Sequence, residues 1–389
     1  MNKIVLLFKI IRQLKSKAVL LMLITLAAET AVIYLAGLYK LPKQYQKELD
    51  NVSGRGGFVY FDTLGQKKDI ESLLADNKYV EDVLYVSFLA NVEYKNDYYF
   101  LKAVSSAKCL GGTLSRNDGG EELRVVSSRS VLKGCSSGQK IKASLLTENA
   151  KTDVELVVDG VVSDDALIMN FQTGSNAVSA YNIFSPCGND IYVLDNRFAR
   201  DCFRELAGFG DSSFFPSNGI VLFTDDSDEA ARNEVAALLL ADNIGVQEKS
   251  EIEKRTNLVA KNNIDSYSAI PLLIMGLSFA SSFAIIVMSI DSETKTVALI
   301  ELIGCSRRQG TALMISAFSL LLIPGAAVNS AIILAVCLRG RQLLENISIT
   351  PESFLLLGGT VLAFLAIITA ASLLLKRTNS HIQRVVEEI

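Results

Sequence analysis

The chain has 389 residues, of which 50% are hydrophobic and 21% charged, with a formal net charge of −4 and a mean hydropathy of +0.31. This composition is too apolar for an ordinary soluble enzyme and too polar for a transporter made mainly of membrane spans. The apolar residues are therefore expected to concentrate in part of the chain.

Four apolar segments are each long enough to cross a bilayer as a helix, which needs about 20 residues. They cover residues 18–39, 268–290, 311–338 and 353–375. A polar stretch, residues 40–267, follows the first segment and is large enough to fold as a domain with its own core. We therefore predict an α-helical membrane protein with four transmembrane helices and one large α+β domain.

Lysine and arginine near the helix ends predict the orientation, because cytoplasmic flanks are enriched in them. The first 17 residues contain no acid and five basic residues, Lys3, Lys9, Arg12, Lys15 and Lys17. Residues 40–267 contain 34 acidic against 25 basic residues. We predict a cytoplasmic amphipathic N-terminal helix (1–17), an extracytoplasmic domain, a short outer loop (339–352) and a cytoplasmic tail (376–389). The alternative for residues 1–39, a cleaved signal peptide, is disfavoured because the apolar run is long and lacks a small-residue cleavage site.

Glu29 lies near the middle of the first predicted span. A charged side chain at that depth costs about 2.5–3.5 kcal/mol on insertion scales. Two hypotheses stay open: the carboxyl is protonated, or it faces a helix interface and stabilises a seam between two copies.

The domain at 40–267 reads as alternating strands and helices. Two βαβ-like units are expected, with their first strands at 56–62 and 218–225. An identical "LLADN" at 73–77 and 239–243 predicts a degenerate internal duplication. Short apolar runs separated by Gly, Ser and Asn predict a β-rich subdomain inserted between the two units, at about residues 106–190.

Cys109, Cys135, Cys187 and Cys202 all lie in the predicted outer domain, where disulfides can form. Pairing Cys109 with Cys135 and Cys187 with Cys202 closes the shortest loops. The alternative is that all four are unpaired and pack as small apolar side chains. The cysteine spacing does not resemble a zinc site, and the single histidine is His381 in the tail, so no metal is expected.

No histidine lies in the outer domain to activate Ser127, Ser128 or Ser130 as a nucleophile. These serines are interpreted as turn and cap residues, with a Ser-Lys pair as the alternative. The β-rich subdomain is therefore predicted to contain no catalytic cluster.

The stretch "SETKTVALIELIGCSRRQG" (292–310) lies between the second and third predicted spans. Its run from Val297 to Ile303 is apolar except for Glu301, and Gly304 is the residue type usual just past a helix C-terminus. A mere connector would be more polar. We predict a short helix that seats in a groove on a soluble partner, followed by basic residues that contact partner carboxylates or lipid headgroups.

This stretch resembles the cytoplasmic-loop signature of the MacB-type permeases of ABC transporters, a superfamily that also includes FtsX and the lipoprotein-release permeases. The residues that carry the resemblance are Val297, Ala298, Ile300, Ile303, Gly304, Ser306, Arg307, Arg308 and Gln309. The basic start "LFKIIRQLKSKAVLL", the four-helix layout and the size of the outer domain also match that plan. Thr296, Glu301 and Gly310 depart from the family pattern, which puts a standard partner in doubt.

The resemblance implies a permease subunit that is not itself an enzyme and that dimerises, with itself or a related permease, beside separate ATP-binding subunits of the MacB or LolD type. ATP and Mg would be bound there, and this chain has no G-x-x-x-x-G-K-[ST] motif. Residues 291–310 would form the coupling-helix loop. The implied coupling residues are Val297, Ala298, Ile300, Glu301, Ile303, Gly304, Arg307 and Arg308.

The implied mechanism is mechanotransmission, in which motion driven by the ATPase reaches the outer domain through a stalk that includes a polar helix at 250–268. The implied place is a bacterial cell membrane, and the implied cargo is a peptide, antibiotic or lipid-linked molecule. An outer adaptor or hydrolase is a further possible partner, and no nucleic acid is expected. The alternatives are an FtsX-like transducer that activates a cell-wall hydrolase without transport, and a sensor without an ATPase.

Overall fold

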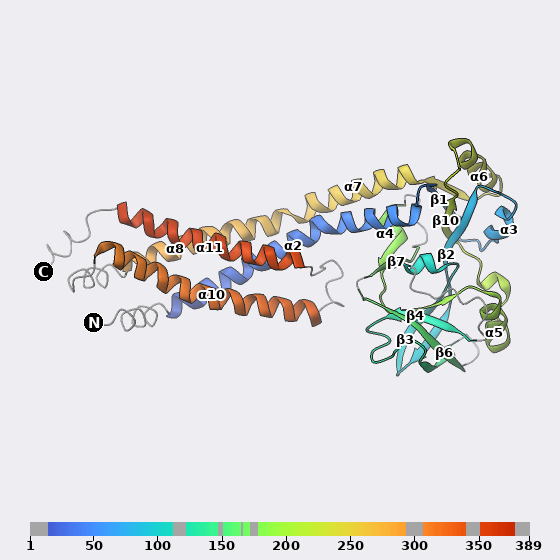
Figure 1. The fold of residues 1–389 in the computed structure, drawn as a ribbon, viewed down its shortest axis with the longest axis horizontal. Helices are drawn as coiled ribbons and strands as arrows, with labels where there is room; N and C mark the ends of the chain where they lie inside the picture. The colour runs from blue at the N-terminus through green and yellow to red at the C-terminus, as the bar shows by residue number, and fades with distance from the viewer. Residues whose placement is uncertain are drawn as a thin grey trace. The chain divides into compact units, whose positions relative to one another are not determined.

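The computed structural model divides the chain into two compact units (Figure 1). Unit 1 comprises Met1–Lys40 and Asn262–Ile389, and unit 2 comprises Leu41–Lys261. The residues that the structure describes are 15–111, 122–146, 151–164, 166–171, 178–292, 306–339 and 351–377.

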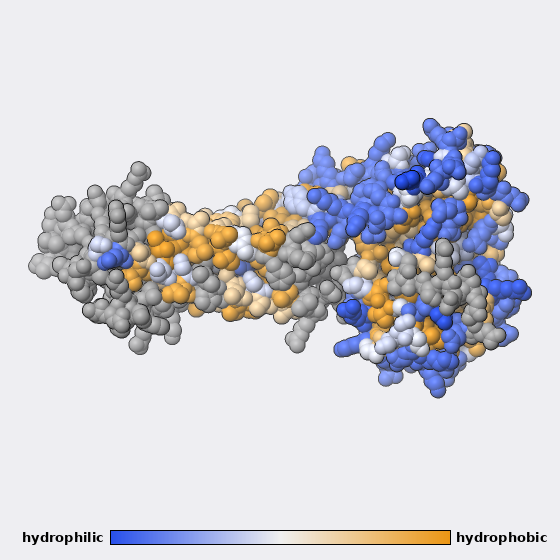
Figure 2. Space-filling view, in the orientation of Figure 1, coloured by the Kyte–Doolittle hydropathy of each residue, from blue (hydrophilic) through white to orange (hydrophobic). Residues whose placement is uncertain are grey.

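Unit 1 is built from long helices that pack side by side: α2 (Lys15–Ser53), α8 (Ala269–Ser292), α10 (Arg307–Arg339) and α11 (Pro351–Arg377). Only the part of α2 up to Lys40 belongs to unit 1. Their shared core is apolar and draws residues from all four helices: Leu21, Ala28, Ile286, Ala317, Phe318, Phe364 and Ile368. A second, smaller cluster joins Ile33, Ile333 and Leu357. On the face that Figure 2 shows, the described surface of these helices is also mainly apolar, as expected for a bundle surrounded by lipid.

Among the described residues, three helices are long and apolar enough to cross a membrane, at Val19–Ser53, Lys249–Ser289 and Ile315–Ala335. The apolar part of α11, Leu355–Ala370, is shorter than these. The structure therefore supports a membrane protein with three candidate spans, and the fourth predicted span stays a prediction.

Unit 2 contains a four-stranded antiparallel layer in which the strand order is β11-β1-β10-β2. The strands are β1 (Phe58–Asp62), β2 (Val80–Tyr94), β10 (Asn218–Phe223) and β11 (Gly245–Glu248), and the helices α3 (Ile70–Leu74) and α6 (Glu229–Ala241) pack on one face. β1 and β2 both flank β10, while β10 and β11 both flank β1. The two predicted βαβ-like units are therefore split units that interleave in one sheet, a ferredoxin-like arrangement.

The repeated "LLADN" follows α3 and α6 with one hydrogen bond in common, because the N–H groups of Asn77 and Asn243 donate to the carbonyls three residues earlier. The two turns differ in conformation, since Asn243 has a positive φ and Asn77 does not. The leucines differ in burial, however. Leu74 is buried and Leu73 exposed in the first copy, whereas Leu239 is buried and Leu240 exposed in the second. The two copies therefore do not match residue by residue, and the duplication stays a prediction.

The second layer of unit 2 is a closed barrel. Its strands run in the order β2, β3 (Asp97–Val104), β9 (Asp190–Leu194), β4 (Arg124–Ser128), β6 (Lys151–Val162) and β5 (Lys140–Leu146), and β5 pairs back with β2. Apolar side chains from every strand fill the interior, and α5 (Arg197–Ala207) adds Ala199 and Phe203. Closure removes the sheet edges that would otherwise pair with other chains.

The predicted bounds of the β-rich subdomain, about 106–190, are too narrow. The barrel also uses β3 and the second half of β2, which precede residue 106. The physical reason is that β2 is one 15-residue strand, bulged between Phe88 and Ala90, that serves both layers. Lys95 and Asn96, both with positive φ, turn it tightly into β3.

Shorter elements connect the layers: η1 (Ala107–Leu110), β7 (Leu167–Met169), α4 (Ala180–Ile183), β8 (Phe184–Pro186) and η2 (Asp211–Ser213). The stretch predicted as a polar helix at 250–268 is α7 (Lys249–Tyr267). The helix prediction is confirmed, and backbone hydrogen bonding continues from α7 into α8 through Ser268.

Candidate functional site

Most of the predicted coupling residues, namely Val297, Ala298, Ile300, Glu301, Ile303 and Gly304, lie outside the described part of the chain. Arg307 and Arg308 open the first turn of α10. The Ser306 N–H donates to the Gln309 side-chain oxygen at 3.2 Å, and the Gln309 N–H donates to the Ser306 carbonyl at 2.8 Å. The segment "SRRQ" is thus the N-terminal cap of α10, one half of a capping box.

Sequence reasoning missed this role, although the S-x-x-Q spacing signals it. The cap also gives Arg307 and Arg308 an unfavourable position. The N-terminus is the positive end of the helix dipole, and a cation there costs about 0.3–1 kcal/mol. The first turn of α10 contains no acid. The two arginines therefore do not stabilise the helix electrostatically.

Within unit 2, the last turns of α2 lie beside the start of α7, where Lys249 joins them. The Lys249 ammonium lies 3.1 Å from the Asp50 carboxylate and 3.4 Å from that of Glu253, and it donates to Ser53 Oγ at 2.8 Å. One turn earlier on α2, the Gln46 amide donates to the Glu253 carboxylate at 3.5 Å. We call Lys249, Asp50, Ser53 and Glu253 the stalk clamp.

The short helix α4 contacts both α2 and α7. The Ala180 N–H donates to Thr256 Oγ1 at 2.8 Å, and the Thr256 hydroxyl donates to the Ile252 carbonyl at 2.7 Å. On the α2 side, the ring centroids of Tyr45 and Tyr181 are 4.4 Å apart. A relative shift of the two helices would therefore act directly on α4 and on β8, which follows it.

A buried ion pair ties the antiparallel layer to the barrel. Arg200 of α5 makes two hydrogen bonds to the Asp195 carboxylate, at 2.7 and 2.9 Å, and the Tyr85 hydroxyl of β2 donates to the same carboxylate at 2.8 Å. The hydrogen bond from Arg200 to Asp195 raises the pKa of the guanidinium. Burial, followed by the Asp195 charge, raises the pKa of the Tyr85 hydroxyl. At neutral pH the Arg200 guanidinium is therefore charged and the Tyr85 phenol is neutral.

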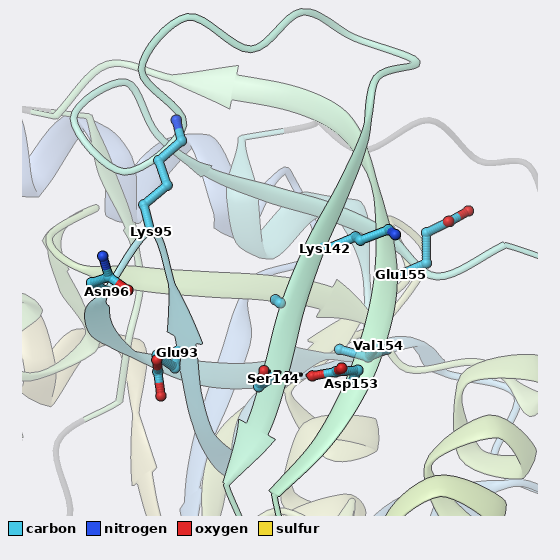
Figure 3. Close-up of a pocket in the computed structure, with 9 residues that line it drawn as sticks. Glu93, Lys95, Asn96, Lys142, Ser144, Asp153, Val154 and Glu155 are labelled. Carbon is cyan, nitrogen blue, oxygen red and sulfur yellow. Dashed lines mark hydrogen bonds between the residues drawn. The ribbon is translucent and has the colours of Figure 1, made fainter.

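A surface pocket of about 440 Å³ lies on the barrel near the β2–β3 turn (Figure 3). Figure 3 shows Ser144 bonded to Asp153 at one end, while Lys95 projects from the turn. The acids that line it are already engaged: Asp153 accepts from Ser144 at 2.7 Å, and Glu93 and Glu155 pair with Lys151 and Lys140 at 2.9 and 2.7 Å. These residues form no nucleophile–base pair, so we assign this pocket no chemistry.

The four cysteines of unit 2 are free thiols in the structure. Cys109 and Cys187 lie in the core between the antiparallel layer and the helices α2 and α7. Cys135 and Cys202 pack against the barrel core instead. The predicted pairs are not formed, because each joins residues of two different cores. Burial raises the pKa of Cys109 and of Cys187 to about 12.

Glu29 is fully buried inside the helix bundle of a single chain. Neither carboxylate oxygen has a hydrogen-bond partner among the described residues. Its position disfavours the hypothesis of a seam between two copies, because the side chain does not reach the outer surface of the bundle.

Among the described residues, no cluster of three or more His, Cys, Asp or Glu side chains could hold a metal ion. No family model matches the chain, and no curated protein matches it. The resemblance to MacB-type permeases therefore stays a prediction that rests on the residues of the 292–310 stretch and on the layout of the chain.

Proposed function

We propose that the chain is the permease subunit of an ABC transporter that works by mechanotransmission. The observation that carries this proposal is the helical continuity within α2 and from α7 into α8. α2 is one 39-residue helix, and α7 continues into α8 through the hydrogen bonds of Ser268 to Ile264 and of Leu272 to Ser268, at 3.0 and 3.1 Å. In both cases an apolar stretch and a polar stretch of sequence are therefore joined by helical hydrogen bonding.

In this mechanism, contacts inside unit 2 would pass motion of α2 and α7 to the rest of the domain. The stalk clamp holds α2 and α7 together, and α4 contacts both. Because α4 leads into β8 and then into barrel strand β9, displacement of the stalk helices would move the barrel and the antiparallel layer differently.

At the other end, the ATPase would engage the loop from 291 to 310. The two arginines at the start of α10 support an external anionic contact, since their position does not stabilise the helix. The partner proposed is a MacB- or LolD-like ATP-binding subunit, which binds ATP and Mg. A second copy or a related permease completes a dimer in a bacterial cell membrane.

The proposed topology has four spans, with α11 as the fourth, cytoplasmic termini and unit 2 outside. The proposed cargo is a peptide, antibiotic or lipid-linked molecule, with an outer adaptor as a possible partner. The alternative is an FtsX-like transducer that acts on a cell-wall hydrolase. The size of unit 2, residues 41–261, favours transport, because FtsX-like outer domains are usually smaller.

The first test is purification of the tagged full chain in mild detergent, with identification of bound proteins by mass spectrometry and an ATPase assay. We expect a P-loop ATPase to co-purify and to be lost when Ile300→Asp is combined with Gly304→Pro. If no ATPase binds the native chain under conditions that keep other membrane complexes intact, the proposal is wrong. A co-purifying hydrolase would favour the transducer.

The second test targets helical continuity. Ser268→Pro removes the N–H that bonds the Ile264 carbonyl and kinks a helix at a cost of about 3 kcal/mol. We expect this variant to keep the ATPase but to lose any ATP-dependent change in the protease sensitivity of unit 2. Ser268→Ala, which keeps the N–H, is the matched control and should behave as the native chain. Equal behaviour of both variants would contradict mechanotransmission through α7 and α8.

A further inference from the structure

Glu29 is the single charged side chain in the apolar stretches of the bundle helices, residues 18–39, 269–290, 309–338 and 353–375. The other titratable side chains in these stretches are Tyr34, Tyr39 and Cys337. No lysine, arginine or histidine is therefore available along these stretches to neutralise a carboxylate.

The surroundings of Glu29 are defined by contacts between α2 and α10. Met22, two turns before Glu29 on the same face of α2, packs against Gly325: a Cβ added to that glycine would lie 2.7 Å from Met22 Cγ. The Asn329 amide of α10 also donates to the Met22 carbonyl at 2.9 Å. One turn after Glu29, Ile33 packs in one cluster with Ile333 of α10 and Leu357 of α11.

Glu29 is thus enclosed between two sets of helix contacts, and its exposed fraction is 0%. The hydroxyl of Thr25, one turn earlier, donates to the Leu21 carbonyl of its own helix at 2.7 Å, so its proton is already used. Neither carboxylate oxygen of Glu29 has a described hydrogen-bond partner. An ionised carboxylate in such a place would carry the full cost of desolvation, whereas a neutral acid would not.

We propose that Glu29 is a proton-binding site, occupied while α2 is packed in the bundle and emptied when α2 separates from α10. In the packed state the side chain is the neutral carboxylic acid. When water reaches it, the O–H bond breaks, the proton passes to water and the carboxylate remains. The ligand is a proton, and the opening of the bundle becomes dependent on pH.

Protonation can be measured directly by infrared difference spectroscopy of the full chain in phosphatidylcholine vesicles at pH 7. We expect the native-minus-Glu29→Gln spectrum to show the carbonyl stretch of a protonated carboxylic acid, which shifts in heavy water. If the difference contains only the bands of an ionised carboxylate, as it would with a bound cation, the proposal is overturned.

The link to α2 packing is tested by two glycine variants. Gly325→Leu inserts a side chain where Met22 already lies and should force α2 and α10 apart. We expect the acid band to disappear at lower pH, with proton affinity reduced about tenfold or more. Gly358→Leu on α11 is the matched control, because nothing lies within 4 Å of a Cβ there, and it should titrate as the native chain does.

Asn329→Ala covers the case in which Gly325→Leu fails to fold. It removes the hydrogen bond to Met22 without adding bulk and should shift the titration in the same direction by a smaller amount. An unchanged titration in Gly325→Leu, or in Asn329→Ala where the former cannot be prepared, would show that the proton is not held by the packing of α2 and would overturn the proposal. None of these measurements requires the ATPase, so their failure is distinguishable from failure of the proposed function.

Discussion

Two buried hydroxyl groups in each unit are satisfied in opposite ways. In unit 1, Thr25 and Thr360 each donate to the carbonyl four residues earlier in their own helix, both at 2.7 Å. In unit 2, the Ser87 hydroxyl donates to the carbonyl of Phe214, 127 residues away, at 2.8 Å. The Ser127 hydroxyl likewise crosses to the carbonyl of Asp190 on another strand at 2.6 Å.

This difference predicts which unit can rearrange. Helices whose hydroxyls are satisfied internally can slide past one another without breaking hydroxyl hydrogen bonds, and packed helices do move by small shears. A unit whose buried polar groups join distant elements must break several hydrogen bonds at once to rearrange. Unit 1 is thus suited to move as separate helices, and unit 2 to respond as connected layers.

The largest expected effect concerns the thiols of unit 2. Burial raises the pKa of Cys109 and Cys187 to about 12, so at pH 8 their thiolate population is about 10³-fold below that of an unfolded cysteine. Their alkylation should be slower than in the denatured chain by at least that factor, and should keep rising with pH where the denatured thiol has reached its plateau. The measurement is mass spectrometry of the alkylated full chain.

The same experiment counts disulfides, because a denatured but unreduced chain exposes every free thiol. We expect all four cysteines of unit 2 to be alkylated in that sample. If adducts were missing at both cysteines of the pair Cys109–Cys135 and of the pair Cys187–Cys202, the disulfides predicted from the sequence would be present. That result would contradict the separation of the two cores.

The next effect tests how firmly the layers of unit 2 are joined. The Asp195 side chain is 1% exposed, so Arg200→Ala leaves a buried charge without its cation and should cost about 3–5 kcal/mol. Hydrogen exchange of the full chain in detergent should show this as faster exchange in α5. The matched control is Arg204→Ala, whose half-exposed pairs with Asp201 and Asp211 are worth at most about 1 kcal/mol. Equal effects of the two substitutions would contradict the view that buried polar contacts hold the layers of unit 2 together.

These contrasts also explain what could be predicted from the sequence. The apolar helices and the strand–helix alternation follow from local periodicity, so they could be predicted from the sequence. The closed barrel was not, because it depends on one long strand, β2, that pairs in two layers and closes on β5 over a large sequence separation. The cysteine pairing failed for a related reason: loop length cannot reveal that Cys109 and Cys135 lie in different cores.

The candidate site shows the same limit. "SRRQ" was read through the family resemblance, although its local signal is a helix cap at Ser306. The stalk helix at 250–268 was predictable because it lacks Gly and Pro, whereas the clamp at Lys249 was not, since Asp50 lies 199 residues earlier. Nothing in the sequence around Glu29 indicates which helix faces it, because that depends on how α2 and α10 pack.

A smaller effect is expected from the polar contact between helices of unit 1. Asn329→Ala removes the hydrogen bond to the Met22 carbonyl. Such bonds between membrane helices are worth about 0.6 kcal/mol on average and at most about 1.7. Thermal unfolding of the full chain in detergent should therefore shift little, while hydrogen exchange in α2 increases. A loss as large as that of Arg200→Ala would mean that unit 1 is also locked by polar contacts.

The smallest effect follows from the internal hydroxyl bonds of unit 1. Thr360→Val keeps the β-branched shape and removes a hydroxyl that bonds only the Leu356 carbonyl of the same turn among the described contacts. That carbonyl already accepts the helical N–H of residue 360, so the change in stability should stay within about 0.5 kcal/mol. Ser87→Ala in unit 2 is the comparison, because it strips the Phe214 carbonyl of a buried donor at a cost of about 1–3 kcal/mol. If the threonine variant loses as much as the serine variant, the hydroxyl of Thr360 joins helices after all, and unit 1 could not slide as freely as mechanotransmission requires.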